Sequence, residues 1–344
     1  MNEDRRLCLK SIGGAIAAAV MSSPVASQEV KPIRIGWQPA QPVSAQIAHT
    51  LAKTNILERN GLKGELIMFS YGPAVNEALV SGAIDVGFVG DMPSVSLAAA
   101  GVPTTVIARQ STFRGSIVVP AENDIKTIQD LKGRKLYGPI GSSIYLAALS
   151  MIEEAGLRPG SDVQILNMSF AELTDALKAG RIESLFIWDP WVEYFVRQKL
   201  ARIVASKTDL AMVIAARDDY RSKNPEAIER FLKAHKEALL FAACNHDKTN
   251  AWFREPAACR TLDLGTVEEA AAQDLQWSAK DLQSIRLSFN PTETERYFGI
   301  GKRAADLKIF PRLPPLDRHI DMAMAARLDK SPWTFDPASV SVKQ

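Results

Sequence analysis

The same unit of helix end, glycine, short apolar strand and a loop holding aspartate and proline occurs twice in this chain. The first copy is residues 78–93, ALVSGAIDVGFVGDMP, and the second is residues 176–190, ALKAGRIESLFIWDP. In each copy a glycine, Gly82 or Gly180, stands where a helix is expected to end. A repeated unit of this kind predicts two similar α/β lobes rather than one long sheet.

Strands and helices alternate in the first part of the chain. Expected strands at residues 33–38 and 66–69 are followed by helical periods at residues 44–57 and 74–80. This alternation predicts parallel strands covered by helices on both faces. Ligands of such sheets bind beyond the carboxyl ends of the strands. Gln38, which ends the first strand, is therefore expected at a binding rim.

Two segments are expected to cross between the lobes. Residues 105–108 and 117–119 predict strands on either side of a polar stretch, and residues 203–204 and 212–216 predict strands that return to the first lobe. Two crossovers form a hinge, and hinged lobes with a cleft between them can enclose a small ligand.

The expected division follows from these crossovers. Lobe 1 comprises residues 31–114 and 212–330, and lobe 2 comprises residues 115–211. Beyond Pro225 the periodicity is helical. The expected helices are residues 226–244, 267–277, 293–307 and 316–328, and a short helix is also expected at residues 124–131.

One turn has the form of an anion-binding helix start. Gly141 follows a strand, and Ser142 and Ser143 stand directly before apolar residues at helical spacing. The first turn of a helix has unpaired N–H groups and about half a positive charge, so an anion binds there without a basic side chain. The alternative is that one serine only caps the helix.

The N-terminus has the form of a targeting segment. Arg5 and Arg6 precede an apolar run at residues 12–21, and small residues follow at 24–27. This pattern predicts that residues 1–27 are a signal peptide, too short to span a bilayer, and that the mature protein is exported. The paired arginines resemble a twin-arginine signal, and an ordinary secretory signal is the alternative.

Composition and spacing exclude several functions. The hydrophobic fraction of 47% and charged fraction of 23% are those of a globular protein, and a net charge of +2 gives no reason to expect a nucleic-acid partner. The four histidines are scattered without metal-ligand spacing, and no Gly-x-Ser-x-Gly motif occurs. We therefore expect no catalytic residue, no metal and no cofactor.

Two cysteines, Cys244 and Cys259, lie outside the expected signal peptide. In an oxidising compartment they could form a disulfide that ties two neighbouring helices together. Two buried free thiols are the alternative, because the sequence between them sets no distance.

Four short motifs stand at expected strand ends and turns. They are Gly82-x-Ile84-Asp85-Val86-Gly87 with Gly90-Asp91-Met92-Pro93, Lys126-Thr127 with Asp130-Leu131-Lys132-Gly133, Gly141-Ser142-Ser143, and Ile187-Trp188-Asp189-Pro190. Together they resemble the periplasmic substrate-binding proteins of ABC importers, and most of all the group for aliphatic sulfonates, taurine and nitrate. The resemblance covers residues 33–220 and is looser in the C-terminal helices.

The resemblance implies a type II periplasmic binding protein of two lobes, with two crossover segments and a helical C-terminal part. Such a protein is a periplasmic monomer that closes on a small sulfonate-type anion, an alkanesulfonate or taurine, and delivers it to a membrane permease. The residues implied as ligand contacts are Gln38, Gly90, Asp91, Met92, Gly141, Ser142, Ser143, Trp188 and Asp189. The chain departs from the family pattern at Thr112, Phe113 and Arg114.

The resemblance leaves other ligands open. They are nitrate, another small organic acid, and a pyrimidine precursor. A thiamine-pyrimidine synthase of similar fold is the enzymatic alternative, but the cluster of cysteines and histidines that such chemistry needs does not occur in this sequence.

Several side chains near the expected site have two interpretations. Trp188 could pack on the organic part of a sulfonate or plug a strand end. Asp91 and Asp189 would repel an anion, so each is expected to bind an ammonium group or to cap a helix. Arg109 and Arg114 could clamp an anion through two nitrogens or be solvated.

Overall fold

The computed structural model describes residues 30–39, 41–70 and 72–343. Within them, eight strands form one sheet in the order β2-β1-β3-β8-β4-β7-β5-β6. The strands are β1 (Lys31–Trp37), β2 (Leu62–Met68), β3 (Val86–Gly90), β4 (Thr104–Pro120), β5 (Lys135–Gly138), β6 (Gln164–Asn167), β7 (Leu185–Trp188) and β8 (Ala201–Arg217). The predicted signal peptide, residues 1–27, lies outside the described residues.

Thirteen α-helices and six short 3₁₀ helices surround the sheet in the described part of the chain. The α-helices are α1 (Pro42–Lys53), α2 (Ile56–Arg59), α3 (Gly72–Ser81), α4 (Asp91–Ala99), α5 (Ser143–Glu154), α6 (Phe170–Lys178), α7 (Trp191–Arg197), α8 (Asp218–Lys223), α9 (Pro225–Cys244), α10 (His246–Phe253), α11 (Leu264–Ala271), α12 (Pro291–Asp306) and α13 (Ala323–Lys330). The 3₁₀ helices are η1 (Ile128–Leu131), η2 (Ala257–Cys259), η3 (Leu275–Ser278), η4 (Leu282–Ser284), η5 (Leu316–Arg318) and η6 (Pro337–Ser339).

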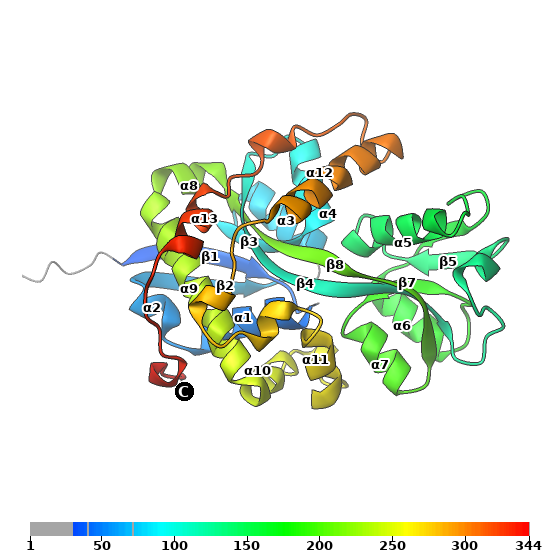
Figure 1. Cartoon of the computed structure of the whole chain (residues 1–344), viewed down its shortest axis with the longest axis horizontal. Coiled ribbons are helices and arrows are strands. Elements are labelled where there is room, and N and C mark those ends of the chain that lie inside the picture. Colours follow the sequence, from blue (N-terminus) through cyan, green and yellow to red (C-terminus); the bar gives the residue numbers. More distant parts are fainter. Residues whose placement is uncertain (1–29, 40, 71, 344) are drawn as a thin grey trace, which may run out of the picture.

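The molecule has two halves, which β4 and β8 join (Figure 1). The expectation that the lobes would have separate sheets is wrong, because β4 and β8 are each one strand of 17 residues that pairs with its neighbours in both halves. The polar stretch at 109–115 is thus the middle of β4, and the two expected strands at 203–204 and 212–216 are parts of β8. The expected lobe boundaries, 114/115 and 211/212, fall inside these strands.

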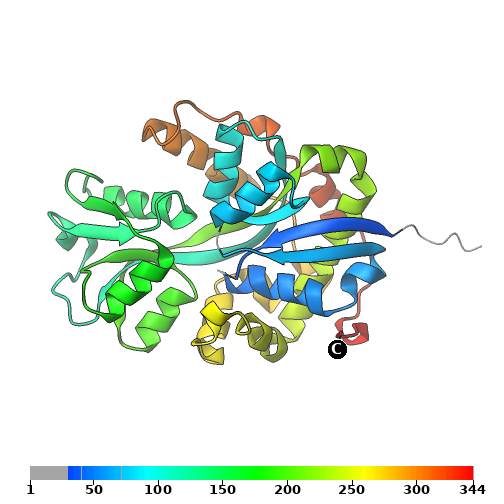
Figure 2. The ribbon, with the colours of Figure 1, turned by 180° about the vertical axis from the view of Figure 1, so that it is seen from behind.

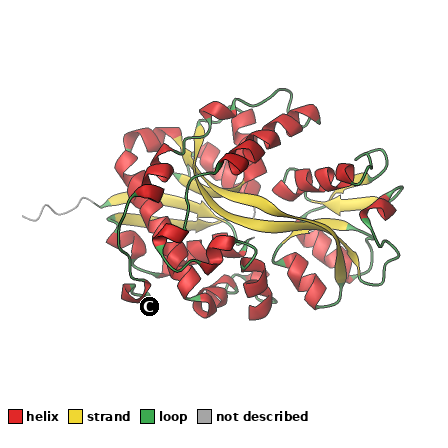
Figure 3. Ribbon diagram, viewed as in Figure 1, coloured by secondary structure: helices red, strands yellow, loops and turns green. Residues whose placement is uncertain are grey.

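The first half contains β1, β2 and β3, with helices on both faces of its part of the sheet (Figure 3). Phe88 of β3 stacks on Phe231 of α9, with ring centroids 6.3 Å apart. Val75 of α3 and Val95 of α4 belong to a second buried cluster, which also contains Val89 of β3. Successive strand residues alternate between the faces, so both sides of β3 are covered.

The second half contains β5, β6 and β7, which are parallel to one another. Helix α5 covers one face of this part of the sheet, and α6 and α7 cover the other (Figures 1 and 3). This half repeats in smaller form the strand-helix alternation of the first half.

The predicted repeat is present in both halves. Gly82 follows α3 with φ +76°, and Gly180 follows α6 with φ +66°. These positive φ values are available to glycine at little cost and end each helix before the next strand. Strand β3 leads directly into α4, which begins at Asp91, whereas Asp189 and Pro190 lie between β7 and α7.

The C-terminal part is helical, as expected, although several boundaries differ. In place of the single helix expected at residues 267–277 the structure has α11 followed by the 3₁₀ helix η3. In place of the one expected at residues 316–328 it has η5 followed by α13. The expected helix at 124–131 is only η1 at its C-terminal end. The two cysteines are free thiols and form no disulfide, and of the two expected buried thiols Cys259 is buried whereas Cys244 is exposed.

Candidate functional site

The two halves meet at the carboxyl ends of their parallel strands. Figure 2 shows β1 and β5 pointing toward each other across the middle of the molecule. Met92 of α4 packs with Leu146 and Leu149 of α5 and with Ala304 of α12 in one buried apolar cluster. On the other side, Arg197 of α7 and Glu269 of α11 form an ion pair at 2.6 Å. The halves are therefore in contact on both sides of this junction.

The N-terminus of α5 lies at this junction with its first N–H groups unpaired. Ser142 is the N-cap residue, but its hydroxyl donates to the carbonyl oxygen of Pro139 at 2.7 Å and does not cap the helix. The backbone N–H groups of Ser143 and Ile144, and the hydroxyl of Ser143, have no hydrogen-bond partner among the described residues. The capping alternative is therefore wrong for both serine side chains, and this helix start has the donors that an anion needs.

Loops of the first half surround this helix start. A Cβ added at Gly90 would stand 2.7 Å from the hydroxyl oxygen of Ser143 and 3.3 Å from Cδ of Pro93. A Cβ added at Gly72 would lie 3.6 Å from both Nε2 of Gln38 and Cγ of Pro93. Gln38, Gly90 and Ser143 therefore lie near one another around Pro93, and their contact with a ligand stays a prediction. The amide of Gln38 makes no hydrogen bond to another described residue.

Asp91 forms an ion pair within the chain. Its Oδ2 lies 2.6 Å from Nη1 of Arg296 in α12, and the same oxygen accepts a hydrogen bond from the N–H of Ala211 at 3.1 Å. Its Oδ1 accepts from the N–H of Met92 at 2.7 Å, in the first turn of α4. The capping interpretation of Asp91 is thus correct in part. Arg296, which also neutralises its charge, was not predicted.

Asp189 lies in a similar arrangement in the second half. Its Oδ1 accepts from Nη2 of Arg114 at 2.8 Å and from the N–H of Glu193 at 3.2 Å. The same Nη2 of Arg114 donates to Oε2 of Glu193 at 2.9 Å. Arg114 is therefore neither solvated nor a free clamp for an anion, because its charge is balanced by two carboxylates. The Nε of Arg114 and the Oδ2 of Asp189 are buried and have no partner in the described part of the chain.

Burial changes the acidity of Asp189. The side chain is 0% exposed, and loss of hydration raises its pKa to about 6, although Arg114 and the N–H of Glu193 act in the opposite direction. An acid whose pKa is raised on folding makes the folded state less stable above that pKa. The penalty disappears as pH falls below the folded pKa, because the folded protein then binds the proton more readily than the unfolded chain.

This shift predicts a pH-dependent difference between the wild type and Asp189→Asn. Between pH 7.5 and pH 4.5 the wild type should gain about 2 kcal/mol of unfolding free energy relative to the variant. Denaturant unfolding at both pH values measures the difference. Asp162→Asn is the control, since the pKa of Asp162 is lowered to about 2 by Arg158, outside this range. If the unfolding free energy of the wild type instead falls relative to that of Asp189→Asn on acidification, the raised pKa of Asp189 is contradicted.

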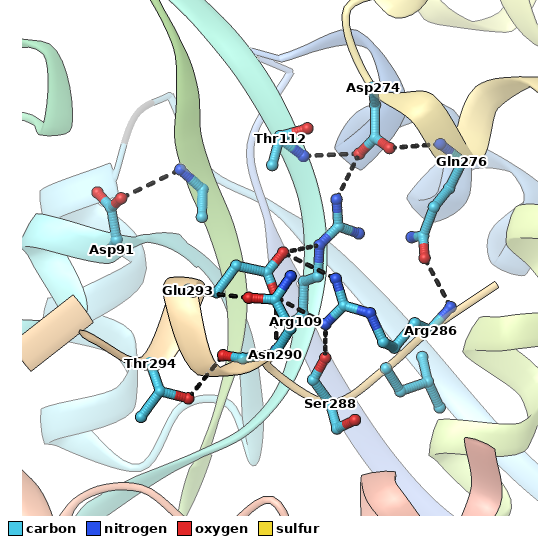
Figure 4. A network of polar contacts seen from close by, with 12 residues as sticks. Asp91, Arg109, Thr112, Asp274, Gln276, Arg286, Ser288, Asn290, Glu293 and Thr294 are labelled. Atoms are coloured by element: carbon cyan, nitrogen blue, oxygen red, sulfur yellow. Dashed lines mark hydrogen bonds and ion pairs between the residues drawn. The ribbon is translucent and has the colours of Figure 1, made fainter. Parts of the chain in front are cut away.

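Arg109 belongs to a separate buried network (Figure 4). Its Nε lies 3.2 Å from Oε1 of Glu293, and its Nη2 lies 3.4 Å from Oδ2 of Asp274. Asp274 also accepts a hydrogen bond from the N–H of Thr112 at 2.6 Å, and Arg286 donates to Glu293 at 2.6 Å. These pairs attach the segment before α12 to the middle of β4. We assign Arg109 a structural role in this network, and its buried Nη1 has no partner among the described residues.

The remaining predicted contacts have apolar partners. Met92 is 1% exposed and belongs to the cluster between α4, α5 and α12, so it joins the halves and offers no free surface to a ligand. Trp188 is half-buried and stacks on Phe170 with ring centroids 5.9 Å apart. This packing supports the interpretation of Trp188 as an aromatic plug at the end of β7.

Four polar side chains near the junction were not predicted. Gln41 and Ser44, in the N-cap and first turn of α1, have a buried Oε1 and a buried Oγ without partners among the described residues. On β4, both the Nε2 and the Oε1 of Gln110 and the hydroxyl of Ser111 are also buried without partners among these residues. A buried polar atom without a partner costs about 1 to 3 kcal/mol, so such atoms are expected to bind water or a ligand.

The described residues contain neither a metal-binding cluster nor a membrane-spanning helix. No group of three or more histidine, cysteine, aspartate or glutamate side chains is arranged to hold a metal ion. Within the same residues, no helix has the length and apolar character needed to cross a membrane.

Comparison with known proteins places this chain in a family. The profile described as NMT1/THI5 like matches residues 55–249. An Escherichia coli (strain K12) protein named for aliphatic sulfonate binding is 32% identical over 231 residues, which are 64% of this chain and 68% of that protein. The taurine-binding periplasmic protein of the same organism is 25% identical over 219 residues, or 62% of this chain and 65% of that protein.

A solved structure agrees with the fold. The alkanesulfonate-binding protein SsuA from Xanthomonas axonopodis pv. citri, bound to MOPS, matches with a TM-score of 0.71 and 21% identity. The match covers 86% of this chain and 99% of that chain, and it supports the periplasmic binding protein fold. From the matched profile and the similarity to the E. coli protein, we conclude that this chain belongs to the NMT1/THI5-like family.

Proposed function

We propose that this protein is the exported solute-binding component of an ABC importer and that it binds a small sulfonate-type anion, an alkanesulfonate or taurine, between its two halves. It then delivers the anion to a membrane permease without any chemical step. The proposed ligand contacts are Gln38, Gly90, Gly141 and Ser143, and Ser142 holds the turn through the bond of its hydroxyl to Pro139. The names of the relatives support the ligand class, and the periplasmic relatives support export through the segment at residues 1–27.

The observation that carries this proposal is the open start of α5. The N–H groups of Ser143 and Ile144 and the hydroxyl of Ser143 are unpaired, and this hydroxyl lies against Gly90 where the two halves touch. The nearby carboxylates of Asp91 and Asp189 each have an arginine partner. An anion at this position therefore meets hydrogen-bond donors and the positive end of the helix dipole without facing an unbalanced negative charge.

The strength of these contacts is sufficient for a carrier. Micromolar binding corresponds to about −8 kcal/mol, and a hydrogen bond to a charged group contributes roughly 1.5 to 3 kcal/mol. Two N–H groups and one hydroxyl supply much of this before the cost of association. An arginine in contact with the anion is not required.

Because the halves are in contact around these donors, a ligand must enter when they separate. We propose lobe 1 as residues 31–114 and 212–330, lobe 2 as residues 115–211, and the paired strands β4 and β8 as the hinge. Bending of two long strands changes the distance between the halves while each half keeps its own packing. The protein is proposed to act as a monomer.

A thermal-shift screen tests the proposal. Ligands that bind only the folded state raise its unfolding midpoint, and a sulfonate at about 100 times its Kd should add about 2.7 kcal/mol. For a chain of this size the expected rise with taurine or an alkanesulfonate is about 4 °C. Nitrate, sulfate and a pyrimidine precursor are the comparison compounds. A rise with the pyrimidine precursor alone would overturn the ligand class and leave the fold unchanged.

A further inference from the structure

Gln110 and Ser111 are adjacent residues of β4 whose buried polar side chains make no hydrogen bond within the described part of the fold. Gln110 is 0% exposed and Ser111 is 1% exposed, and the amide atoms of the first and the hydroxyl of the second have no partner among the described residues. They lie at an irregularity of the strand, where the pairing with β8 shifts between Arg109 and Ser111. A bulge of this kind changes the direction of a side chain and is common beside binding sites.

The strand register places Ser111 beside the junction. Ser111 pairs with Met212 of β8, and Met212 pairs with Gly90 of β3. Directly paired residues project from the same face of a sheet. The side chain of Ser111 and a Cβ added at Gly90 would therefore lie on the same face. That added Cβ would stand 2.7 Å from the hydroxyl of Ser143. Ser111 therefore lies two strand spacings, about 10 Å, from Gly90, on the side where the start of α5 lies.

The first turn of α1 completes this polar surface. Helix α1 contacts β4, and its unpartnered Gln41 Oε1 and Ser44 Oγ are also buried. A short ligand that starts at the donors of α5 and extends over Gly90 along the sheet would have its far end beside Ser111 of β4. One end of such a ligand would meet the donors of α5, and the other end would meet Gln110 and Ser111.

We infer that Gln110 and Ser111 are specificity-determining residues, which select a short sulfonate with a second hydrogen-bonding group, a hydroxyl or an amine, over a plain alkanesulfonate. This inference rests on the proposed function of the same site. A plain alkyl chain would leave the amide of Gln110 and the hydroxyl of Ser111 buried without partners. A site that contains such groups rejects a ligand that lacks the matching group.

Calorimetric titration with three probes of equal chain length tests the inference. They are ethanesulfonate, 2-hydroxyethanesulfonate and taurine. The wild type should bind at least one of the last two about tenfold more tightly than ethanesulfonate, which corresponds to one hydrogen bond. In Ser111→Ala and in Gln110→Met this preference should fall to about twofold or less, while the affinity for ethanesulfonate stays within about threefold.

Ser116→Ala is the matched control. Ser116 is a buried serine of the same strand, but its hydroxyl is already hydrogen-bonded to the hydroxyl of Ser206 at 2.7 Å. This variant should keep the wild-type preference. The two test variants remove polar atoms without partners, so neither should lower the unfolding midpoint.

The outcomes separate two kinds of failure. Equal affinities of the wild type for the three sulfonates, or a preference that survives in both test variants, would overturn this inference alone. If none of the three sulfonates binds, the proposed function is wrong and the inference falls with it.

Discussion

Replacing Ser142 with aspartate is expected to weaken sulfonate binding at least about 100-fold, because two effects act together. An aspartate at the N-cap accepts a hydrogen bond from the second or third N–H of the helix, and here the second is the free N–H of Ile144. The carboxylate also places a negative charge at the position proposed for the anion. The new carboxylate thus occupies the N–H group and the positive end of the helix that the sulfonate is proposed to bind.

Folding should not suffer from this change. Aspartate is as good an N-cap residue as serine, and the present side chain of Ser142 is bonded to Pro139 and does not cap α5. The unfolding midpoint of Ser142→Asp should therefore equal or exceed that of the wild type. Ser142→Ala is the control, since it adds no charge and should keep affinity within about threefold. Calorimetry that finds unchanged binding by Ser142→Asp would place the anion elsewhere.

Gly90→Ala is expected to weaken binding by at least about tenfold, for a steric reason. The new Cβ would stand 2.7 Å from the hydroxyl oxygen of Ser143 and 3.3 Å from Cδ of Pro93. Either the halves stay further apart or the Ser143 hydroxyl rotates away from the ligand. Backbone strain is not involved, because φ of Gly90 is −68° and alanine adopts this value readily.

Two further variants separate sterics from other causes. In the Gly90→Ala and Ser143→Ala double variant the colliding oxygen is absent, so binding should be no weaker than in Ser143→Ala alone. Gly299→Ala places a methyl group in open space on helix α12, and it should leave binding unchanged and raise stability by up to about 1 kcal/mol. Additive losses in the double variant would contradict contact between the halves at Gly90 in the bound state.

The sequence predicted the repeat and its loops because these depend on local signals. Glycine after α3 and α6, and the turn before Ser142 and Ser143, are set by backbone conformation and capping over a few residues. The positions of Gln38, Gly90 and Ser143 at one junction follow from the general rule for the carboxyl ends of parallel strands. These parts of the site therefore needed no long-range information.

The long strands were predicted in pieces because their polar middle is stabilised by distant residues. The N–H of Thr112 donates to Asp274, and Arg109 is neutralised by Asp274 and Glu293, far along the chain. No local pattern indicates that such a polar stretch is buried. The pairing of Asp91 with Arg296 was missed for the same reason.

The sequence does contain a signal for Gln110 and Ser111, because both lie in a polar stretch between two apolar strand segments. In this polar stretch the residues expected as possible anion clamps are the arginines, Arg109 and Arg114. In the structure the charges of Arg109 and Arg114 are balanced by carboxylates, whereas Gln110 and Ser111 between them have no partner among the described residues for any polar side-chain atom. Polar residues within a crossover strand deserve weight as candidate ligand contacts.

A crystal structure grown with taurine tests the central claim most directly. We predict that the sulfonate oxygens lie within about 3 Å of the backbone nitrogens of Ser143 and Ile144, with Gly90 closing over them. Taurine bound away from the start of α5, with these N–H groups still unpaired, would contradict the account.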